Sequence, residues 1–237
     1  MIFTNPQPSL AQIRSFYPDY LYENKRNKKW MCLFKALFNK KRLNRILKLH
    51  PDTKKLLDVG IANGSFLQAA KAKGLDIWGT ELSENSVKYC KKLLKTKNIF
   101  IGDLSHVPGS DFDVITMWDV IEHFVNPEEY IAKAGKLLKE GGILAIQTMD
   151  TNTLNFKFAK NKWAFFCGQH LFCFNKKLLL RLVERNGFRL IKTVPYDVSF
   201  MHLLLFFTKL PEYLFFGGKF PYYFTLFEYY FEKKSKS

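Results

Sequence analysis

The chain has 237 residues, of which 47% are hydrophobic and 24% are charged, as in globular proteins. A chain of this length buries well over half of its unfolded surface, so its core needs neither disulfides nor metals. The four cysteines form no CxxC pair, which favours free thiols in a reducing compartment. The first ten residues lack the basic and apolar regions of a secretory signal, so we expect a cytoplasmic protein.

The basic surplus is large but unevenly distributed. There are 37 Lys and Arg against 21 Asp and Glu, a formal net charge of +16, yet only 7 of the basic residues are Arg. Lysine offers phosphate a point charge in place of the forked arginine contact, so the total alone does not indicate nucleic-acid binding. Residues 24–55 hold twelve basic residues and one acid, a charge of +11. Two interpretations of this stretch remain open. It docks on an anionic partner, or it only reflects a Lys-rich composition and has no function of its own.

Helices are expected in the N-terminal segment, residues 1–50. Residues 9–17 suit one short helix, and from Trp30 to Phe38 apolar residues recur at the spacing of an amphipathic helix. The phase is lost across residues 39–42, so we expect two short helices or one bent helix. This basic helical cap would either pack its apolar stripe on the main domain or lie on an anionic membrane.

Strand-like and helix-like stretches alternate along residues 51–197. Cap residues such as Ser83 and Asn126 precede the helices, and glycines such as Gly141 stop them. This alternation predicts a Rossmann-like α/β fold, a three-layer sandwich around a mostly parallel seven-stranded sheet. The expected strands are 55–60, 75–81, 99–102, 112–118 and 143–148, and the expected helices are 63–73, 84–94, 127–139 and 176–186.

The C-terminal segment, residues 198–237, is rich in aromatic residues. It holds 14 of the 39 aromatic side chains between Phe200 and Phe231. Its longest uninterrupted apolar run, residues 203–207, is far too short to span a bilayer. Core packing, a wall for an apolar substrate and a membrane-facing patch remain open as its role.

A glycine-containing turn, LDVGIANGS at residues 57–65, follows the first expected strand. Gly60 lets the backbone approach a ligand, and the N–H groups of the following helix favour an anionic group. Glu81 ends the second expected strand, where a carboxylate can accept hydrogen bonds from a ribose diol. A dinucleotide is disfavoured, because a GxGxxG turn would need glycine where Ala62 and Ser65 stand. The turn and the acid together predict a different nucleoside cofactor.

Further motifs follow in the same order along the chain. They are DVGIANG (58–64), TELS (80–83), GDL (102–104), FDVITMWDVIEHFVNP (112–127) and LLKEGGILAIQT (137–148). Over residues 50–195 this series resembles the class I S-adenosylmethionine-dependent methyltransferases. The DVIEH sequence, with the later GQHLFCF, resembles the branch that contains ubiquinone-biosynthesis O-methyltransferases. Ile61 and Ala62 depart from the Cys-Gly that is frequent in the first motif of this family.

The resemblance implies S-adenosylmethionine as the cofactor and a role for each matched residue. Asp58 would help to position the methionine amino group, Glu81 would hold the ribose, and Asp103 would accept a hydrogen bond from the adenine amino group. Trp118 would lie beside the sulfonium. The implied cofactor-binding residues are Asp58, Gly60, Ile61, Ala62, Gly64, Glu81, Leu82, Asp103, Leu104 and Trp118.

Candidate catalytic residues follow the fourth expected strand of the core. His123 is the preferred general base for a hydroxyl acceptor, with Asp119 beside it and His170 later in the chain. Together with Glu122, these residues also resemble the divalent-metal site of some small-RNA 2′-O-methyltransferases, so a metal stays open as an alternative. In an alternative without catalysis, Glu122 and His123 have a structural role and only cap the next helix.

The resulting expectation is an enzyme that methylates a hydroxyl of a small-molecule, sugar or lipid-linked acceptor. The C-terminal segment would supply the last strand and part of the acceptor pocket. Two alternatives remain: an RNA methyltransferase that docks through the basic residues 24–55, and an inactive methyltransferase fold that acts as a membrane or scaffold protein. Contact with the inner face of a membrane is also left open.

Overall fold

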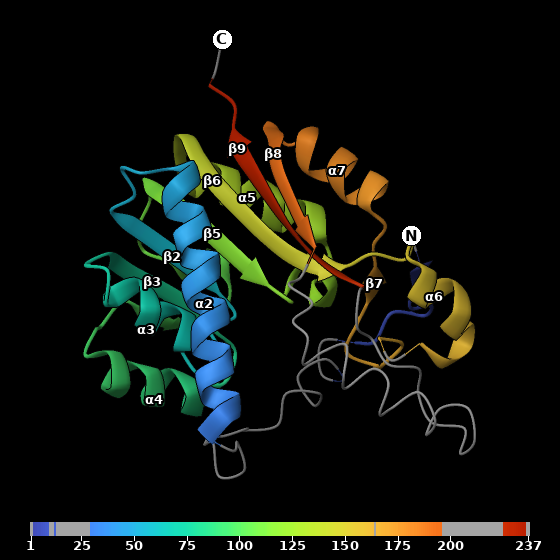
Figure 1. Cartoon of the computed structure of the whole chain (residues 1–237), viewed down its shortest axis with the longest axis horizontal. Coiled ribbons are helices and arrows are strands. Elements are labelled where there is room, and N and C mark those ends of the chain that lie inside the picture. The colour runs from blue at the N-terminus through green and yellow to red at the C-terminus, as the bar shows by residue number, and fades with distance from the viewer. Residues whose placement is uncertain (1, 10–11, 13–28, 164, 196–224, 236–237) are drawn as a thin grey trace.

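The structure is a computed structural model that describes residues 2–9, 12, 29–163, 165–195 and 225–235 (Figure 1). The main sheet consists of β2 (Lys55–Val59), β3 (Asp76–Glu81), β4 (Ile99–Ile101), β5 (Phe112–Trp118), β6 (Leu138–Met149), β8 (Phe188–Pro195) and β9 (Leu226–Lys233). Its seven strands lie in the order β4-β3-β2-β5-β6-β9-β8. Strand β9 runs antiparallel to β6 and β8, and the other pairs are parallel. The predicted fold class is confirmed.

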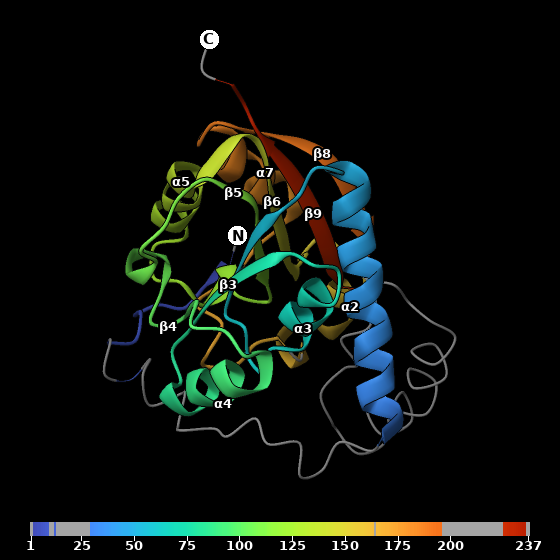
Figure 2. The same ribbon diagram turned by 90° about the vertical axis from the view of Figure 1, so that its left-hand side faces the viewer.

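Helices cover both faces of this sheet (Figures 1 and 2). On one face lie α2 (Lys29–Leu49), α3 (Ser65–Lys71) and α4 (Glu84–Leu94), and on the other lie α5 (Pro127–Leu137) and α7 (Lys176–Glu184). The loops carry η1 (Leu104–His106), η2 (Ile121–His123), α6 (Leu154–Ala159) and η3 (Lys160–Lys162), and the short strands β1 (Ile2–Phe3) and β7 (Phe172–Cys173) pair with each other.

Most expected elements occur, with shifts at some ends. Strand β5 and helix α4 have the expected bounds. Helix α5 ends before the expected residue 139, because Leu138 already pairs with Phe112 as part of β6. Gly141, with a φ of 76°, is therefore a position inside β6 and not the helix stop that we predicted. The expected helix at 9–17 lies almost wholly outside the described residues, as does the apolar run at 203–207.

Helix α2 is one continuous helix that packs on the domain. Phe38, Leu43 and Ile46 are buried on its inner side. The Asn39 side-chain amide donates to the Ser65 hydroxyl at 2.9 Å, which ties α2 to the first residue of α3. Its apolar stripe thus packs on the main domain, the first of the two arrangements left open by the sequence. The lysines at positions 35, 40, 41 and 48 are exposed.

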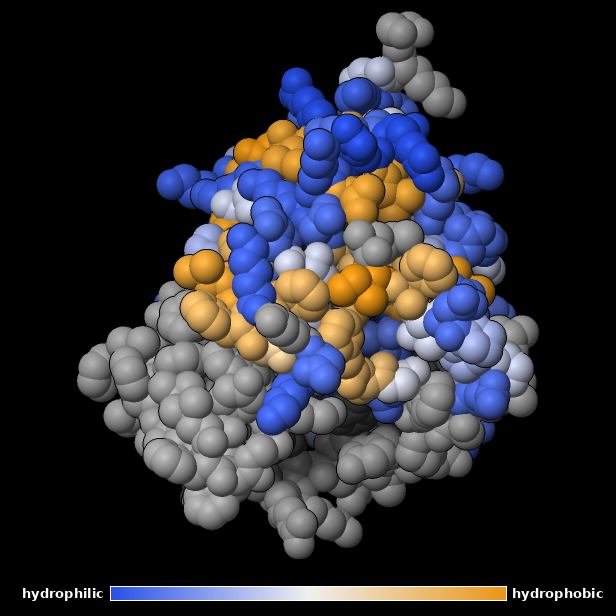
Figure 3. Space-filling view, turned by 90° about the vertical axis from the view of Figure 1, so that its right-hand side faces the viewer, coloured by the Kyte–Doolittle hydropathy of each residue, from blue (hydrophilic) through white to orange (hydrophobic). Residues whose placement is uncertain are grey.

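Helix α6 presents apolar side chains to solvent. Leu154 and Phe158 lie four residues apart, and each is 70% exposed. Lys157 beside them is also exposed. Figure 3 shows apolar side chains among hydrophilic ones on the side of the molecule where α6 and α7 lie in Figure 1. Over the part of the chain that the structure describes, we find no helix with the length and apolar character needed to cross a membrane.

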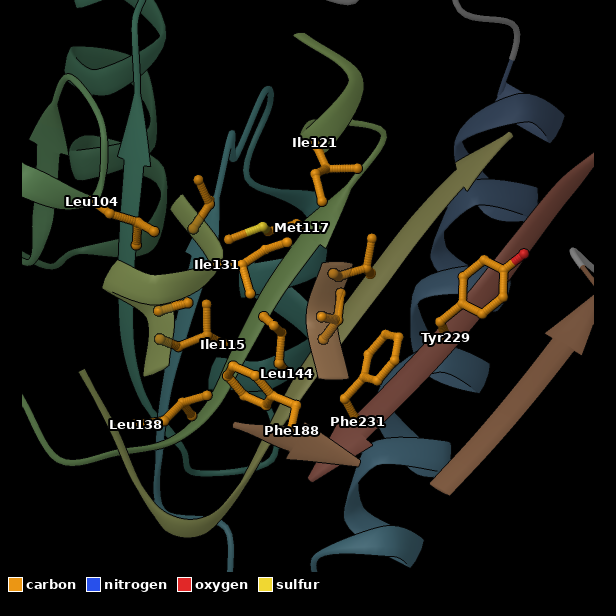
Figure 4. Packing of buried hydrophobic residues seen from close by; sticks show 14 of the residues in the cluster. Leu104, Ile115, Met117, Ile121, Ile131, Leu138, Leu144, Phe188, Tyr229 and Phe231 are labelled. Carbon is orange, nitrogen blue, oxygen red and sulfur yellow. The ribbon is translucent and has the colours of Figure 1, made fainter. Parts of the chain in front are cut away.

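Neighbouring residues on the strands contribute to two separate cores. Leu57 and Ile115 pack toward α5 and α7, whereas Leu56 and Val114 pack toward α2, α3 and α4. Figure 4 shows the first of these cores, in which Tyr229 and Phe231 of β9 join residues from β5, β6 and α5. The C-terminal strand is therefore part of the sheet that positions the site.

Candidate functional site

The turn between β2 and α3 has the tight backbone that its glycines predict. Gly60 has a φ of 73°, and a Cβ at this position would lie 2.7 Å from Cγ2 of Val120. The N–H groups of Gly60 and Ile61 donate to the Thr80 carbonyl at 2.9 and 3.1 Å. Gly64, also with a φ of 73°, precedes the first residue of α3. The turns after β2 and β5 consequently meet at the carboxyl edge of the sheet.

The Ile61 side chain lies in the core beneath this turn. It is 4% exposed and packs among residues of α3 and α4. Its Cγ2 would lie only 2.5 Å from a Cβ at position 79, which explains why Gly79 stands there. The branched side chain therefore adds no bulk to the exposed side of the turn. The departure from the family's first motif at position 61 thus has a structural explanation.

The Glu81 carboxylate links three backbone N–H groups around the turn. Its Oε2 accepts from Ala62 N at 2.9 Å, and its Oε1 accepts from Leu82 N at 2.8 Å and Ser83 N at 3.2 Å. Ala62 itself has a φ of 50°, in the left-handed region. A carboxylate that is fixed by charge-assisted bonds on one side can still accept hydroxyl donors with its remaining lone pairs.

Asp58 and Trp118 are further predicted cofactor residues at the same edge. Asp58 is buried and accepts a 2.6 Å bond from the Thr116 hydroxyl. Burial raises the pKa of Asp58 to about 7, against the opposing effects of Thr116 and Arg42. The Trp118 ring meets Phe66 edge-on, with centroids 5.4 Å apart. Among the described residues, its indole N–H is buried without a hydrogen-bond partner.

The three residues predicted to lie near adenine differ in their exposure to solvent. Leu82 is 53% exposed, so it is free to cover one face of a ring. Asp103 caps η1 through Ser105 N at 2.7 Å and accepts from the Tyr130 hydroxyl at 2.7 Å. Although partial burial opposes the shift, these bonds lower the pKa of Asp103 to about 2. Leu104 is buried in the core, so only its backbone is left for a ligand.

Taken together, these residues fit S-adenosylmethionine. The anchored carboxylate at position 81, the exposed Leu82, and the Trp118 indole N–H, which has no partner in the part of the chain that the structure describes, all lie in segments that end at one edge of the sheet. Ligands bind in this position in open α/β sheets, outside the carboxyl ends of the strands. These groups suit a ligand that contains a ribose, an adenine and an aliphatic chain.

Asp119 follows Trp118 and has an unusual backbone. Its φ is 55°, and its N–H donates to the Gln147 carbonyl at 3.1 Å. The Gln147 side-chain amide donates to both Asp119 carboxylate oxygens, at 2.8 and 2.7 Å. Solvent reaches Asp119, yet the surrounding protein raises its pKa by desolvation while Gln147, Arg42 and His170 oppose the shift. The carboxylate is thus held in one orientation at an accessible place.

The structure brings His123 and His170 together. Their ring centroids lie 4.9 Å apart. The Nδ1 atom of His123 is 2.8 Å from the Gln169 carbonyl, and that of His170 is 2.7 Å from the Phe165 carbonyl. Desolvation, together with the neighbouring His170, lowers the pKa of His123 to about 4, and desolvation also lowers that of His170. Both imidazoles are therefore neutral near pH 7. The Phe165 carbonyl favours a proton on Nδ1 of His170, whereas His123 has backbone hydrogen-bond partners at both Gln169 and Asp119.

Glu122 completes a group that fits a divalent cation. One ligand atom from each of Glu122, His123 and His170 lies within 4.8 Å of the others. The buried Glu122 accepts from the Thr148 hydroxyl at 3.0 Å, while its Oε1 has no partner among the described residues. Burial and the nearby Asp119 raise the pKa of Glu122 to about 8. Asp119, the fourth residue of the predicted metal set, does not belong to this group.

Sequence reasoning missed three polar residues that join the site from outside its motifs: Arg42, Gln147 and Glu228. Arg42 of α2 bonds to both Gln147 and Glu228, and its guanidinium carbon lies 4.5 Å from the Trp118 ring centroid. The available signal was an amide and a carboxylate in otherwise apolar strands, since a buried polar group needs a partner.

Comparisons with known proteins identify the family of this chain. A model of the methyltransferase domain matches residues 22–193, so the chain belongs to that family. The match shows a methyltransferase domain, and the fold is that of S-adenosylmethionine-dependent methyltransferases of known structure. Solved structures of such enzymes from Archaeoglobus fulgidus (TM-score 0.59, 18% identity, 87% of this chain and 100% of that one) and Clostridium acetobutylicum (0.61, 10%, 96% and 100%) are similar in fold.

Curated relatives are similar over 45% of this chain. The ubiquinone biosynthesis O-methyltransferase of Dechloromonas aromatica is 29% identical over 113 residues, which cover 45% of this chain and 49% of that protein. The enzyme of the same name from Psychrobacter arcticus is 28% identical over 115 residues, 45% of each chain. The chain thus spans about half the length of the curated relatives it matches.

Proposed function

We propose that this enzyme transfers the methyl group of S-adenosylmethionine to a hydroxyl oxygen of a small or lipid-linked acceptor. The observation that carries the proposal is the pair of neutral imidazoles, His123 and His170, beside the candidate cofactor site. A hydroxyl must lose its proton as it attacks, and a neutral imidazole can take that proton. The O-methyltransferase names of the relatives support the same acceptor atom.

In this mechanism the chain binds and orients both reactants. Bound S-adenosylmethionine supplies an electrophilic methyl group. Glu81 holds the ribose hydroxyls, and Asp58 stabilises the methionine amino group through the turn that begins at Gly60. Alignment of the hydroxyl with the methyl group can supply about 7–11 kcal/mol of the barrier, so orientation outweighs proton transfer. His123 accepts the hydroxyl proton, and Asp119 stabilises the resulting imidazolium.

The test is methyl transfer from labelled S-adenosylmethionine to a panel of phenols, sugars and polyprenylated phenols. The base assignment predicts that His123→Gln lowers the transfer rate about 10²- to 10⁴-fold while binding of S-adenosylhomocysteine stays the same. His50→Gln is the matched control, because His50 precedes β2 and lies at the opposite edge of the sheet. A full rate in His123→Gln, or products methylated only on nitrogen, would refute the proposal.

Glu122, His123 and His170 also support a metal-assisted form of the reaction, because their ligand atoms lie within 4.8 Å of one another. A divalent cation held there would lower the pKa of an acceptor hydroxyl. Dialysis against a chelator separates the two forms. An unchanged rate supports His123 as the base, whereas a lost rate that Mg²⁺, Mn²⁺ or Zn²⁺ restores supports the metal-assisted form.

A lipid-linked acceptor would require access to a membrane surface. The exposed Leu154 and Phe158 of α6, with Lys157 between them, support contact with an anionic bilayer, because apolar anchors next to basic side chains suit that interface.

A further inference from the structure

Arg42 connects three parts of the protein that are distant in the sequence. It belongs to α2, and its side chain is mostly buried. Its Nε donates to Glu228 Oε1 of β9 at 3.1 Å, and another guanidinium nitrogen donates to the Gln147 side chain of β6. Its planar group also lies over the Trp118 ring, 4.5 Å from the centroid. One side chain of the N-terminal helix therefore contacts the carboxyl ends of two central strands.

The contact with Gln147 determines which way that amide points. A glutamine amide has an acceptor oxygen on one side and an NH₂ donor on the other. Because Arg42 donates to Oε1, the NH₂ group faces Asp119 and donates to both carboxylate oxygens, at 2.8 and 2.7 Å. Without the guanidinium, the buried Gln147 Oε1 loses the Arg42 donor, and the Asp119 carboxylate is left to orient the amide without it.

The contact with Trp118 acts on the other side of the site. The ring is held between Phe66, which meets it edge-on, and the Arg42 guanidinium. Guanidinium groups stack favourably on indole rings. Trp118 and Asp119 are consecutive residues, so Arg42 acts on the ring directly and on the carboxylate through Gln147.

We propose that Arg42 is a positioning residue for methyl transfer, which fixes the Trp118 ring and the Asp119 carboxylate and thereby makes the site depend on helix α2. This inference rests on the proposed function, in which Trp118 lies beside the sulfonium and Asp119 beside the base. Displacement of a group by about 1 Å in such a site can cost 10²-fold in rate. Arg42 touches neither reactant in this account; it acts through the Trp118 ring, through the Gln147 amide and through its own positive charge near Asp119.

Arg45 provides a matched control one turn along the same helix. It pairs with the same carboxylate, Glu228, and its NH1 lies 3.2 Å from the Tyr230 hydroxyl. Loss of Arg45 removes an ion pair to β9 but leaves the contacts of Arg42 with Gln147 and Trp118. A purely structural role for Arg42 predicts that both substitutions behave alike.

The experiment compares Arg42→Met and Arg45→Met in the full chain. It measures the thermal midpoint, the affinity for S-adenosylhomocysteine by calorimetry, the single-turnover methyl-transfer rate, and the NMR signal of the Trp118 indole N–H, assigned with Trp118→Phe. We expect Arg42→Met to lower the rate about 10- to 100-fold and to shift the indole signal, with the affinity changed less than about threefold. Arg45→Met should keep the rate within about threefold and leave the signal in place.

Equal rate losses in the two variants, or an unchanged rate and indole signal in Arg42→Met, would overturn the inference. If the wild type methylates no hydroxyl acceptor, the proposed function fails on its own. The indole signal then still decides about Arg42, because it needs no acceptor: a shift in Arg42→Met alone supports the positioning role, and no shift overturns it.

Discussion

Glu81 illustrates how much one side chain can organise at the residue scale. It accepts hydrogen bonds from backbone groups on both sides of the cofactor turn, at Ala62 and at Leu82. The bonds satisfy these backbone N–H donors, and they orient the carboxylate at the end of β3. The family resemblance identified this residue by its position, and the structure supplies the bonds that hold it there.

We expect Glu81→Gln to weaken binding of S-adenosylhomocysteine about 10- to 100-fold. An amide cannot accept with both of its atoms, and a hydrogen bond to a charged group contributes about 1.5–3 kcal/mol. Calorimetry measures the affinity. Glu84→Gln is the control, because Glu84 is an exposed residue of α4 whose carboxylate pairs with Lys88 one turn away. Equal affinity in Glu81→Gln and the wild type would contradict the assignment.

Asp58 allows a prediction about pH. Burial raises the pKa of Asp58 from 3.8 to about 7. The folded state therefore holds a proton that the unfolded chain releases, so the contribution of this residue to stability is complete below pH 3.8 and is lost as the pH rises through about 7. Asp58→Asn cannot titrate and still offers an oxygen to the Thr116 hydroxyl.

Urea unfolding at several pH values tests this prediction. The free energy of unfolding of the wild type should fall relative to that of Asp58→Asn as the pH rises from about 4 to about 8. Parallel pH profiles for the two proteins would mean that Asp58 titrates normally in the fold.

At the scale of elements, α2 belongs to the domain despite its basic composition. Its inner side contributes Leu43 and Ile46 to the same core as α3 and α4. Its two arginines at positions 42 and 45 pair with the buried Glu228, so part of the basic surplus is used inside the molecule. The expected loss of helical phase at residues 39–42 did not break the helix, because Asn39 and Arg42 find polar partners where the apolar stripe is interrupted.

Ile46→Ala should therefore destabilise the protein by about 2–5 kcal/mol, since the side chain is fully buried and its loss leaves a cavity. Leu37→Ala on the same helix should cost no more than about 0.5 kcal/mol, because Leu37 is 51% exposed. Chemical denaturation measures both values. Similar small effects of the two substitutions would show that α2 contributes little to the stability of the domain.

At the scale of the whole molecule, the formal charge of +16 coexists with exposed apolar side chains on α6. Basic charge attracts a protein to anionic lipid, and apolar side chains then anchor it at the interface. Neither feature alone would hold a protein on a bilayer. Their combination in one molecule, and not the total charge, is what suggests a membrane surface as a partner.

We expect the protein to co-sediment with vesicles that contain phosphatidylglycerol, and less so as the salt concentration rises. The double substitution Leu154→Ser and Phe158→Ser should weaken this binding, whereas Leu37→Ser, an exposed apolar position on α2, should not. If the double variant binds as well as the wild type, α6 is not the anchor. If no protein binds, the membrane contact is refuted.

The local features of this protein could be predicted from the sequence. The alternation of apolar strands and capped helices, the turn at Gly60 and the acid at Glu81 depend on residues within a few positions of one another. Helix caps at Ser83, Asn126 and Asn175 accept the N–H bonds that their residue types predict. The class of cofactor was predicted from such local patterns, because the turn residues and the acid that indicate it stand at the ends of strands that the sequence itself predicts.

The acceptor side depended on the tertiary structure. His123 and His170 meet because the segment before β7 packs on η2, where the Leu171 N–H donates to the Glu122 carbonyl. Arg42, Gln147 and Glu228 come from separate elements and meet because β6 and β9 are neighbours in the sheet under α2. No local pattern specifies that β9 inserts antiparallel between β6 and β8. Partners of buried polar groups are chosen by the packing of the whole sheet, so the sequence alone predicted the class of cofactor, and the tertiary structure decided which side chains meet at the candidate site.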